Sequence, residues 1–172
     1  MNFLELAKKR YSCRSYSEKK VEKEKLDLVL ESGRVAPSGV NKQPQRLIVV
    51  QTEEGLEKIG KACRIYNAPL AIIVCGNKEE VWVSPYNQKS ILDIDVSIVT
   101  DHMMLQATEL GLDSLWVCWF DPEIIKNEFK IPKNLEPINI LALGYGDKEA
   151  ASSNRHDKLR KPLEETVIYE SY

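Results

Sequence analysis

The chain has 172 residues, 24 of them basic and 26 acidic, and its formal net charge is −2. This near-balanced charge argues against nucleic acid or an anionic membrane as a partner. The length suffices for one sizeable core, so we expect a single domain over residues 1–172. No apolar run approaches the roughly 20 residues that span a bilayer, and the first residues lack a signal peptide's apolar core. A cytoplasmic protein is therefore expected.

The amino-terminal third is expected to contain two helices and a strand. Apolar side chains recur at helical spacing over residues 2–9. A second helix is expected at 22–32, capped by Ser17 or a nearby residue and ended by Gly33. The apolar run at 47–51 predicts a strand.

The middle of the chain alternates helical and strand patterns. Thr52 is expected to cap a helix that runs to residue 62. The apolar run 70–75 predicts a buried strand. Residues 78–89 show no period and are interpreted as a mobile loop over a pocket or an irregular connection. Residues 90–110 form the longest helical pattern, which is apolar enough for a central core helix.

The carboxyl-terminal third begins with a strand expected at 113–119. Asp121 and Pro122 predict the start of a helix over 123–129, and a last strand is expected at 138–143. Residues 146–154 are small and polar and are interpreted as a linker.

The four cysteines, Cys13, Cys63, Cys75 and Cys118, show neither CxxC spacing nor a paired histidine pattern. They are expected to be reduced and mostly buried, and no metal site is expected.

The segment Arg10-Tyr11-Ser12-Cys13-Arg14 follows the first expected helix. If it is extended, Arg10, Ser12 and Arg14 point to one side. Two guanidinium groups and a hydroxyl there suit a phosphate and a neighbouring polar group. A solvated charged patch is the alternative interpretation.

Basic residues also concentrate at 8–10 and 155–161. We interpret the two clusters as converging on one anion. A solvated tail is the alternative for the second cluster.

A second polar segment, residues 36–44, lies between a helical run and an apolar run. Its amides and hydroxyl can bind the polar edge of a planar ring, and its prolines limit flexibility. A rigid turn that leads into a buried strand is the alternative. The residues concerned are Pro37, Ser38, Asn41, Gln43 and Pro44.

Together these two segments resemble the nitroreductase family of flavin mononucleotide (FMN) oxidoreductases, whose members carry an R-x-S-x-R-like segment followed by a P-S-x-x-N-x-Q-P loop. Residues 111–116, 143–146 and 158–163 resemble three further family segments. The likeness covers nearly the whole chain in the right order, and this order makes it far more specific than any one motif.

The resemblance implies an α+β fold, with a mostly antiparallel sheet enclosed by helices around a long central one. The alternation of strands and helices alone would favour a parallel sheet. We follow the resemblance, because periodicity does not report strand direction. No G-x-G-x-x-G segment follows any expected strand.

The resemblance also implies which residues bind FMN. Arg10, Lys158 and Arg160 would hold the phosphate, and Arg14 would extend toward the ribityl chain or the N1–O2 edge of the ring. Backbone donors of Val117 to Trp119 would face N5. The full expected set is Arg10, Tyr11, Ser12, Arg14, Pro37, Ser38, Asn41, Gln43, Val117, Cys118, Trp119, Lys158 and Arg160.

Two of these residues depart from the family pattern. Relatives often have an acidic or small residue at the position of Cys118 and a small one at the position of Trp119. Trp119 is expected either to wall the pocket or to lie in the core. A catalytic role for the Cys118 thiol would need a lowered pKa, for which the sequence gives no sign.

The implied function is an oxidoreductase that uses FMN as cofactor and NADH or NADPH as co-substrate. Hydride would pass through flavin N5 to a small-molecule electron acceptor such as a nitroaromatic, a quinone or another conjugated compound, with no catalytic side chain required. The alternatives are a non-enzymatic flavin carrier or sensor, and a specialised reaction such as dehalogenation or flavin breakdown.

The resemblance finally implies a homodimer with FMN at the subunit interface, in which loop 37–43 contacts the flavin held mainly by the other subunit. Residues 146–172 would be a linker and an extension that reaches the partner. The β-prone run 166–169 has no obvious partner in its own chain, and an unpaired apolar strand tends to add to a sheet edge. Pairing within the same chain is the alternative.

Overall fold

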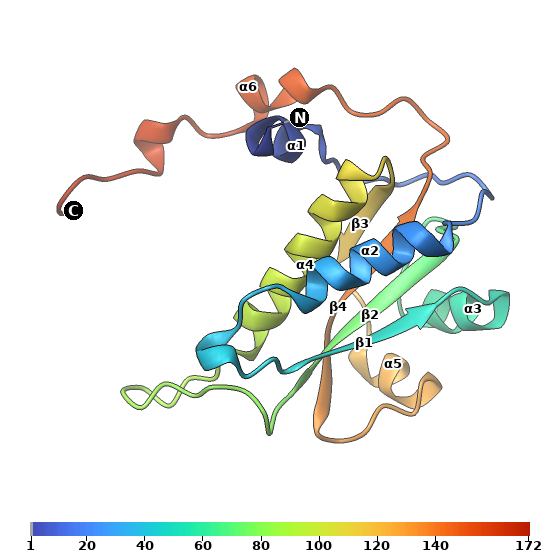
Figure 1. The fold of residues 1–172 in the computed structure, drawn as a ribbon, viewed down its shortest axis with the longest axis horizontal. Helices are drawn as coiled ribbons and strands as arrows, with labels where there is room; N and C mark the ends of the chain where they lie inside the picture. Colours follow the sequence, from blue (N-terminus) through green and yellow to red (C-terminus); the bar gives the residue numbers. More distant parts are fainter. Residues whose placement is uncertain (1) are drawn as a thin grey trace.

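The computed structural model describes residues 2–172 and shows an α+β fold built on one four-stranded sheet (Figure 1). The strand order is β1-β2-β4-β3, and every neighbouring pair is antiparallel. The α+β class and the antiparallel sheet implied by the resemblance are therefore confirmed. The strands are β1 (Gln45–Val50), β2 (Leu70–Asn77), β3 (Asp113–Val117) and β4 (Leu135–Gly144).

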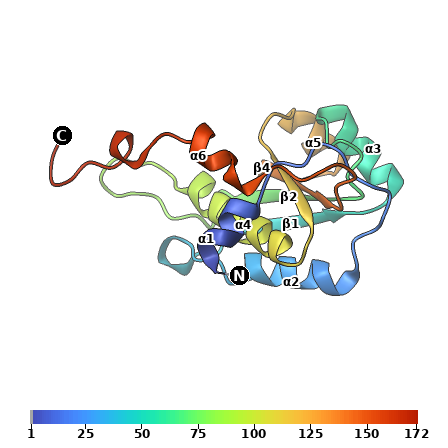
Figure 2. The ribbon, with the colours of Figure 1, turned by 90° about the horizontal axis from the view of Figure 1, so that it is seen from above.

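Helices cover both faces of this sheet. The long helix α4 packs on one face and α2 packs against it, while α3 and α5 lie together on the other face (Figures 1 and 2). The helices are α1 (Phe3–Lys9), α2 (Lys23–Arg34), α3 (Glu53–Ala62), α4 (Leu92–Glu109), α5 (Pro122–Glu128) and α6 (His156–Leu159). The short 3-10 turns are η1 (Gly39–Asn41), η2 (Ser153–Arg155) and η3 (Leu163–Glu165).

Strand β2 is the centre of the core, and all eight of its residues are buried. Ile72 and Val74 face the layer of α2 and α4, whereas Ile73 and Cys75 face the layer of α3 and α5. A strand covered on both faces reads as a continuous apolar run, which is what the sequence shows at 70–75.

Two expected helix starts are confirmed by their capping contacts. The Gly55 N–H donates to Thr52 Oγ1 over 3.2 Å at the start of α3. The N–H groups of Glu123 and Ile124 donate to Asp121 Oδ1 at the start of α5. These caps satisfy main-chain donors that the first helical turn leaves free.

Two expected signals around α2 are wrong. The helix begins where expected, with Glu22 at the N-cap, but no side chain caps it, and the Ser17 N–H donates to the Tyr145 carbonyl oxygen (2.8 Å). Gly33 does not end it, because the helix continues to Arg34. A Cβ on Gly33 would lie 2.9 Å from Met103 Cγ, so this glycine instead permits α2 to approach α4 closely.

The last 27 residues leave the body of the molecule after β4 and pass α1 before extending outward (Figures 1 and 2). Residues 157–172 are exposed, and 166–169 form no strand within the chain. Residues 78–89 form a series of turns before α4, and Val83 makes an antiparallel bridge with Ser90. Within residues 2–172, no helix has the length and apolar character needed to cross a membrane.

Candidate functional site

The Arg10–Arg14 segment is extended and lies against the start of the edge strand β3. Ser12 forms a parallel bridge with Ser114, and the Cys13 N–H donates to the Ser114 carbonyl oxygen over 2.9 Å. Cys13 is buried, whereas Ser12 and Arg14 are exposed and Arg10 is half-buried. The alternation expected from the sequence is thus present.

The inward side of this segment is fixed by a compact polar cluster. The Gly146 N–H donates to Asp113 Oδ2 over 2.8 Å. A Cβ on Gly146 would lie 2.8 Å from that oxygen and 2.9 Å from the Tyr11 hydroxyl, so only glycine fits. Burial, with the nearby Asp113 carboxylate adding to it, raises the pKa of Tyr11 above its ordinary value. The Tyr11 phenol therefore stays neutral and anchors the segment.

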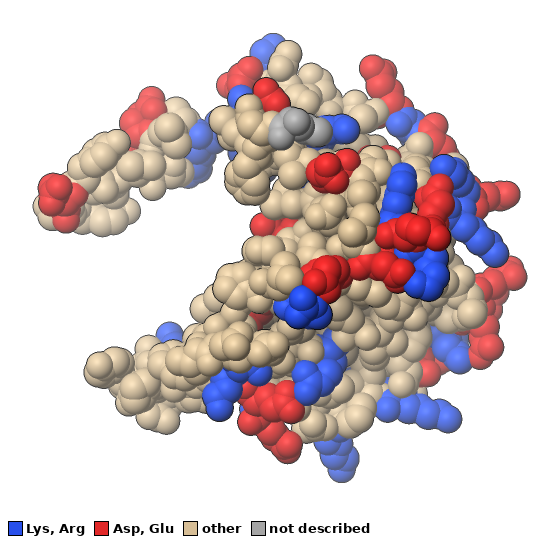
Figure 3. Space-filling model, viewed as in Figure 1, with Lys and Arg blue, Asp and Glu red and all other residues tan. Residues whose placement is uncertain are grey.

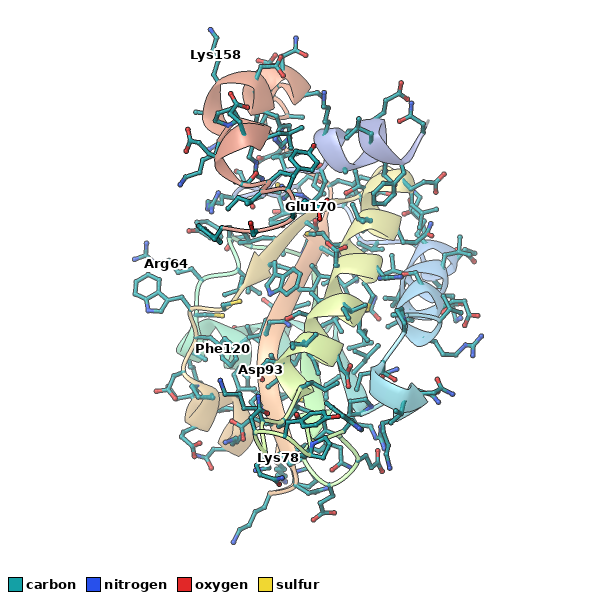
Figure 4. The ribbon with its side chains drawn as sticks, turned by 90° about the vertical axis from the view of Figure 1, so that its left-hand side faces the viewer. Arg64, Lys78, Asp93, Phe120, Lys158 and Glu170 are labelled. Carbon is teal, nitrogen blue, oxygen red and sulfur yellow. The ribbon has the colours of Figure 1, made fainter. Side chains whose placement is uncertain are left out.

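The two basic clusters lie side by side in the structure. Arg155 donates through Nη1 to the Lys8 carbonyl oxygen (3.2 Å) and through Nη2 to that of Arg10. Burial, followed by the positive charges of Arg155 and Arg160, lowers the pKa of Arg10. A negatively charged group such as a phosphate would therefore bind favourably beside Arg10. Lys158 does not join this cluster, since its side chain points away from the body (Figure 4).

A cavity of about 780 Å³ opens where α3 ends, beside the turn from β3 into α5. Arg14 and the expected residues Val117, Cys118 and Trp119 line it. Trp119 is 95% exposed, so the expectation that it could lie in the core is wrong. Cys118 is also exposed.

Three further lining residues, Lys61, Arg64 and Tyr66, were missed from the sequence. Lys61 lies in the last turn of α3, whereas Arg64 and Tyr66 come after it, and the three carry no recognisable motif. The φ angles of 55° at Tyr66 and 59° at Asn67 are left-handed, and such strained positions concentrate at functional sites. Arg64 projects from the same side of the molecule as Phe120 (Figure 4).

The cavity is rich in positive charge. Lys61 forms an ion pair with Glu128 over 2.8 Å. The Asp121 carboxylate accepts hydrogen bonds from the first turn of α5. Among residues 2–172, neither Arg14 nor Arg64 forms an ion pair. Burial raises the pKa of the Cys63 thiol to about 11, so this lining thiol is neutral at physiological pH. The cavity therefore suits a planar ligand with a polar, electron-rich edge.

Loop 37–43 lies elsewhere in the chain. It packs against the first turn of α4, where the Gly39 N–H donates to Asp95 Oδ1 over 2.9 Å. The Arg10–Arg14 segment lies beyond the other end of α4, beside Gly111 and Ser114. An 18-residue helix is about 27 Å long. One chain therefore does not bring Pro37, Ser38, Asn41 and Gln43 to Arg10, Ser12 and Arg14 (Figure 1).

Comparison with known proteins identifies the class to which this fold and cavity belong. The Nitroreductase family model matches residues 7–65 and 60–145, and the chain belongs to this family.

Individual relatives agree. A crystal structure of a nitroreductase family protein from Clostridium difficile 630 has a TM-score of 0.98 and 63% identity, with all of both chains covered. An FMN-dependent nitroreductase from Clostridium difficile R20291 has a TM-score of 0.80 and 30% identity, over 99% of this chain and 100% of that one. The FMN reductase [NAD(P)H] of Bacillus subtilis is 24% identical, over 94% of this chain and 70% of that protein.

Proposed function

We propose that this protein is an FMN-dependent oxidoreductase that takes hydride from NADH or NADPH and passes it to a small conjugated acceptor. One observation carries the proposal. The Arg10–Arg14 segment joins two positively charged regions. At its Arg10 end lie Arg155 and Arg160. At its Arg14 end lies the cavity beside Val117 to Trp119. This order of groups matches a ligand with a phosphate at one end and a planar ring at the other.

The phosphate end of the proposed site consists of Arg10, Ser12 and Arg160. Arg10 is half-buried and lies near the positive charges of Arg155 and Arg160, which Asp101 offsets in part. A dianion beside Arg10 would relieve this repulsion and accept charge-assisted hydrogen bonds. Lys158 lies on α6 with its side chain pointing away from the body of the molecule, so we leave it out of the phosphate end (Figure 4).

The ring end consists of the cavity residues. A bound flavin supplies the redox chemistry by accepting and donating hydride at N5. Arg14 and Arg64 lie on the cavity wall, and neither is neutralised by an ion pair in the described chain. Their positive charge would stabilise the negative charge that a flavin ring gains on reduction. Cys118 and Trp119 follow the end of the edge strand β3, so their main-chain groups can bond to a ligand.

The acceptor class follows from what the cavity contains. Aromatic side chains at Tyr66 and Trp119 favour flat, conjugated molecules such as quinones and nitroaromatics. Hydride transfer by stacking on a flavin needs no side-chain acid or base, so we propose none.

We further propose that the working form is a homodimer with two composite sites. Loop 37–43 and the Arg10–Arg14 segment lie at opposite ends of α4. Two copies related by a two-fold axis would bring the loop of one to the arginine segment of the other.

The surface supports this arrangement. Figure 3 shows a hollowed, mostly uncharged face between the carboxyl-terminal arm and the lower part of the molecule. Exposed apolar side chains lie on the elements that border this face, and they include Phe3, Leu4, Ile94, Leu163 and Ile168. Large exposed apolar patches of this kind mark protein interfaces. We also propose a cytoplasmic location, where cysteines are kept reduced.

The proposal is tested with the purified protein and its Arg10→Ala variant. We expect a flavin absorbance band, and NAD(P)H oxidation with a quinone or nitroaromatic would distinguish an enzyme from a flavin carrier. Arg10→Ala should weaken FMN binding about tenfold or more, because charge-assisted contacts to phosphate are strong. Arg34→Ala, at an exposed arginine paired with Glu31 on α2, is the matched control. Wild-type FMN affinity in Arg10→Ala across a salt series would refute the phosphate assignment.

A further inference from the structure

We propose that Asp95 is a positioning residue that fixes the conformation of loop 38–43 for flavin binding. The inference rests on the proposed function, and it assigns a role to a buried acid that the cavity and the arginine cluster do not include. Asp95 lies in the first turn of α4 and is only 2% exposed. The Gly39 N–H donates to its Oδ1 over 2.9 Å.

This hydrogen bond is the polar connection between the loop and the helix. The other hydrogen bonds of residues 38–43 in the described chain are made locally, such as Gln43 N–H to Ser38 Oγ (2.9 Å) and Asn41 N–H to the Ser38 carbonyl oxygen (2.9 Å). They close the loop on itself but do not orient it relative to α4. Asp95 does so with a charge-assisted bond, which is stronger than one to a neutral acceptor.

The loop needs such a tether because its backbone is strained. Val40, Asn41 and Gln43 have left-handed φ angles of 45°, 59° and 51°. Left-handed geometry is unfavourable for residues other than glycine, and most of all for a β-branched residue such as Val40. Strained conformations persist only where the surroundings hold them, and they cluster at ligand sites.

Packing around Gly39 makes the tether possible. A Cβ at this position would collide with the Ile91 side chain and come within 3.4 Å of Trp82 Cβ. Glycine therefore lets the loop backbone approach α4 closely enough for its N–H to reach the carboxylate. The second oxygen, Oδ2, is buried without a partner in the described chain. A half-satisfied buried carboxylate is costly to stability, so its presence here suits a positioning role better than a purely stabilising one.

The test compares Asp95→Ala and Asp95→Asn with the control Asp93→Ala, which changes an exposed acid on the same turn of α4. We expect Asp95→Ala to raise the FMN dissociation constant about tenfold, because a bond to a charged acceptor is lost. Asp95→Asn keeps a carbonyl acceptor and should recover most of the affinity. Asp93→Ala should bind within about twofold of the wild type, as surface changes away from a site do.

Two further measurements separate positioning from general destabilisation. Hydrogen exchange of the Gly39 amide without flavin should accelerate in Asp95→Ala and stay slow in Asp93→Ala. Val50→Ala, in the core at the far end of β1, should lower the melting temperature without changing FMN affinity.

The proposal would be overturned if a folded Asp95→Ala variant has the same FMN affinity and the same Gly39 amide exchange rate as the wild type. If Asp95→Ala does not fold, Asp95→Asn decides. A dissociation constant raised by a few fold with faster Gly39 exchange supports the tether, and wild-type values for both refute it. If the wild-type protein binds no FMN, the proposed function fails, whereas Gly39 exchange still tests the tether itself.

Discussion

The guanidinium of Arg155 bonds directly to the main chain of Arg10, across 145 residues of sequence. It also donates to the carbonyl oxygens of Lys8 (3.2 Å) and Ser152 (2.8 Å), so it joins the end of α1 to the segment before α6. His156 Nε2 lies 3.2 Å from the same Lys8 oxygen. Arg155 therefore bonds to main-chain carbonyl oxygens and holds the start of the carboxyl-terminal arm, which carries Arg160, beside the Arg10 segment.

Arg155→Ala should destabilise this junction and weaken FMN binding. Hydrogen bonds from a charged donor are worth about 1.5–3 kcal/mol each, and half-exposure reduces this, so we expect an overall loss of about 1–2 kcal/mol in the free energy of unfolding. Urea denaturation and FMN titration measure the two effects. Arg155→Lys keeps the charge but loses the planar fork, and it should therefore resemble the alanine variant. Recovery by lysine would show that only charge matters here.

Gly146→Ala should disturb the same segment from its inner side. The added methyl would meet Asp113 Oδ2 and the Tyr11 hydroxyl. Overpacking of this kind costs about 1–3 kcal/mol, which thermal denaturation would detect as a lower melting temperature. Gly60→Ala on α3 is the control, because nothing lies within 4 Å of its added methyl and alanine favours a helix. Equal melting temperatures for the wild type and Gly146→Ala would contradict this reading of the cluster.

Local signals in the sequence predicted most elements of the fold. Thr52 and Asp121 are side-chain caps, whose contacts lie within three residues and can be recognised without tertiary information. The prediction for Gly33 was wrong. A glycine near a helix end can either end the helix or allow another helix to pack closely, and only the position of Met103 in the fold shows which role applies. Strand direction came from the family resemblance, since apolar runs are the same in parallel and antiparallel sheets.

The site was less predictable than the fold. Alternation in an extended segment correctly placed Ser12 and Arg14 on the exposed side of the segment. Arg64 and Tyr66 could not be found, because they lie in the irregular connection after α3, where Tyr66 begins a left-handed turn that its residue type does not encode. The separation of loop 37–43 from the arginine segment depends on the length and packing of α4, which local patterns do not report.

Trp119→Gly should change acceptor size without loss of FMN. The side chain is 95% exposed at the cavity, so its removal should alter the free energy of unfolding by no more than about 0.5 kcal/mol. Relative rates with small and bulky quinones measure the effect, and bulky acceptors should gain. Trp119→Phe, which keeps an aromatic plane, is the control and should retain the wild-type preference. Unchanged relative rates in the glycine variant would show that Trp119 does not limit the acceptor site.

Truncation after Leu163 should abolish both dimerisation and FMN binding. The removed segment contains exposed Val167, Ile168 and Tyr169 and forms no strand in its own chain. Apolar, β-prone residues of this kind are stabilised by a partner's surface. In the proposed dimer this segment would cover part of the partner's apolar face, which Figure 3 shows open within one chain. Without the segment we expect monomers or aggregates in analytical ultracentrifugation. Glu164→Gln, a conservative change at an exposed position in the full-length chain, should remain a flavin-loaded dimer. A truncated protein that also sediments as a flavin-loaded dimer would exclude a role for the arm.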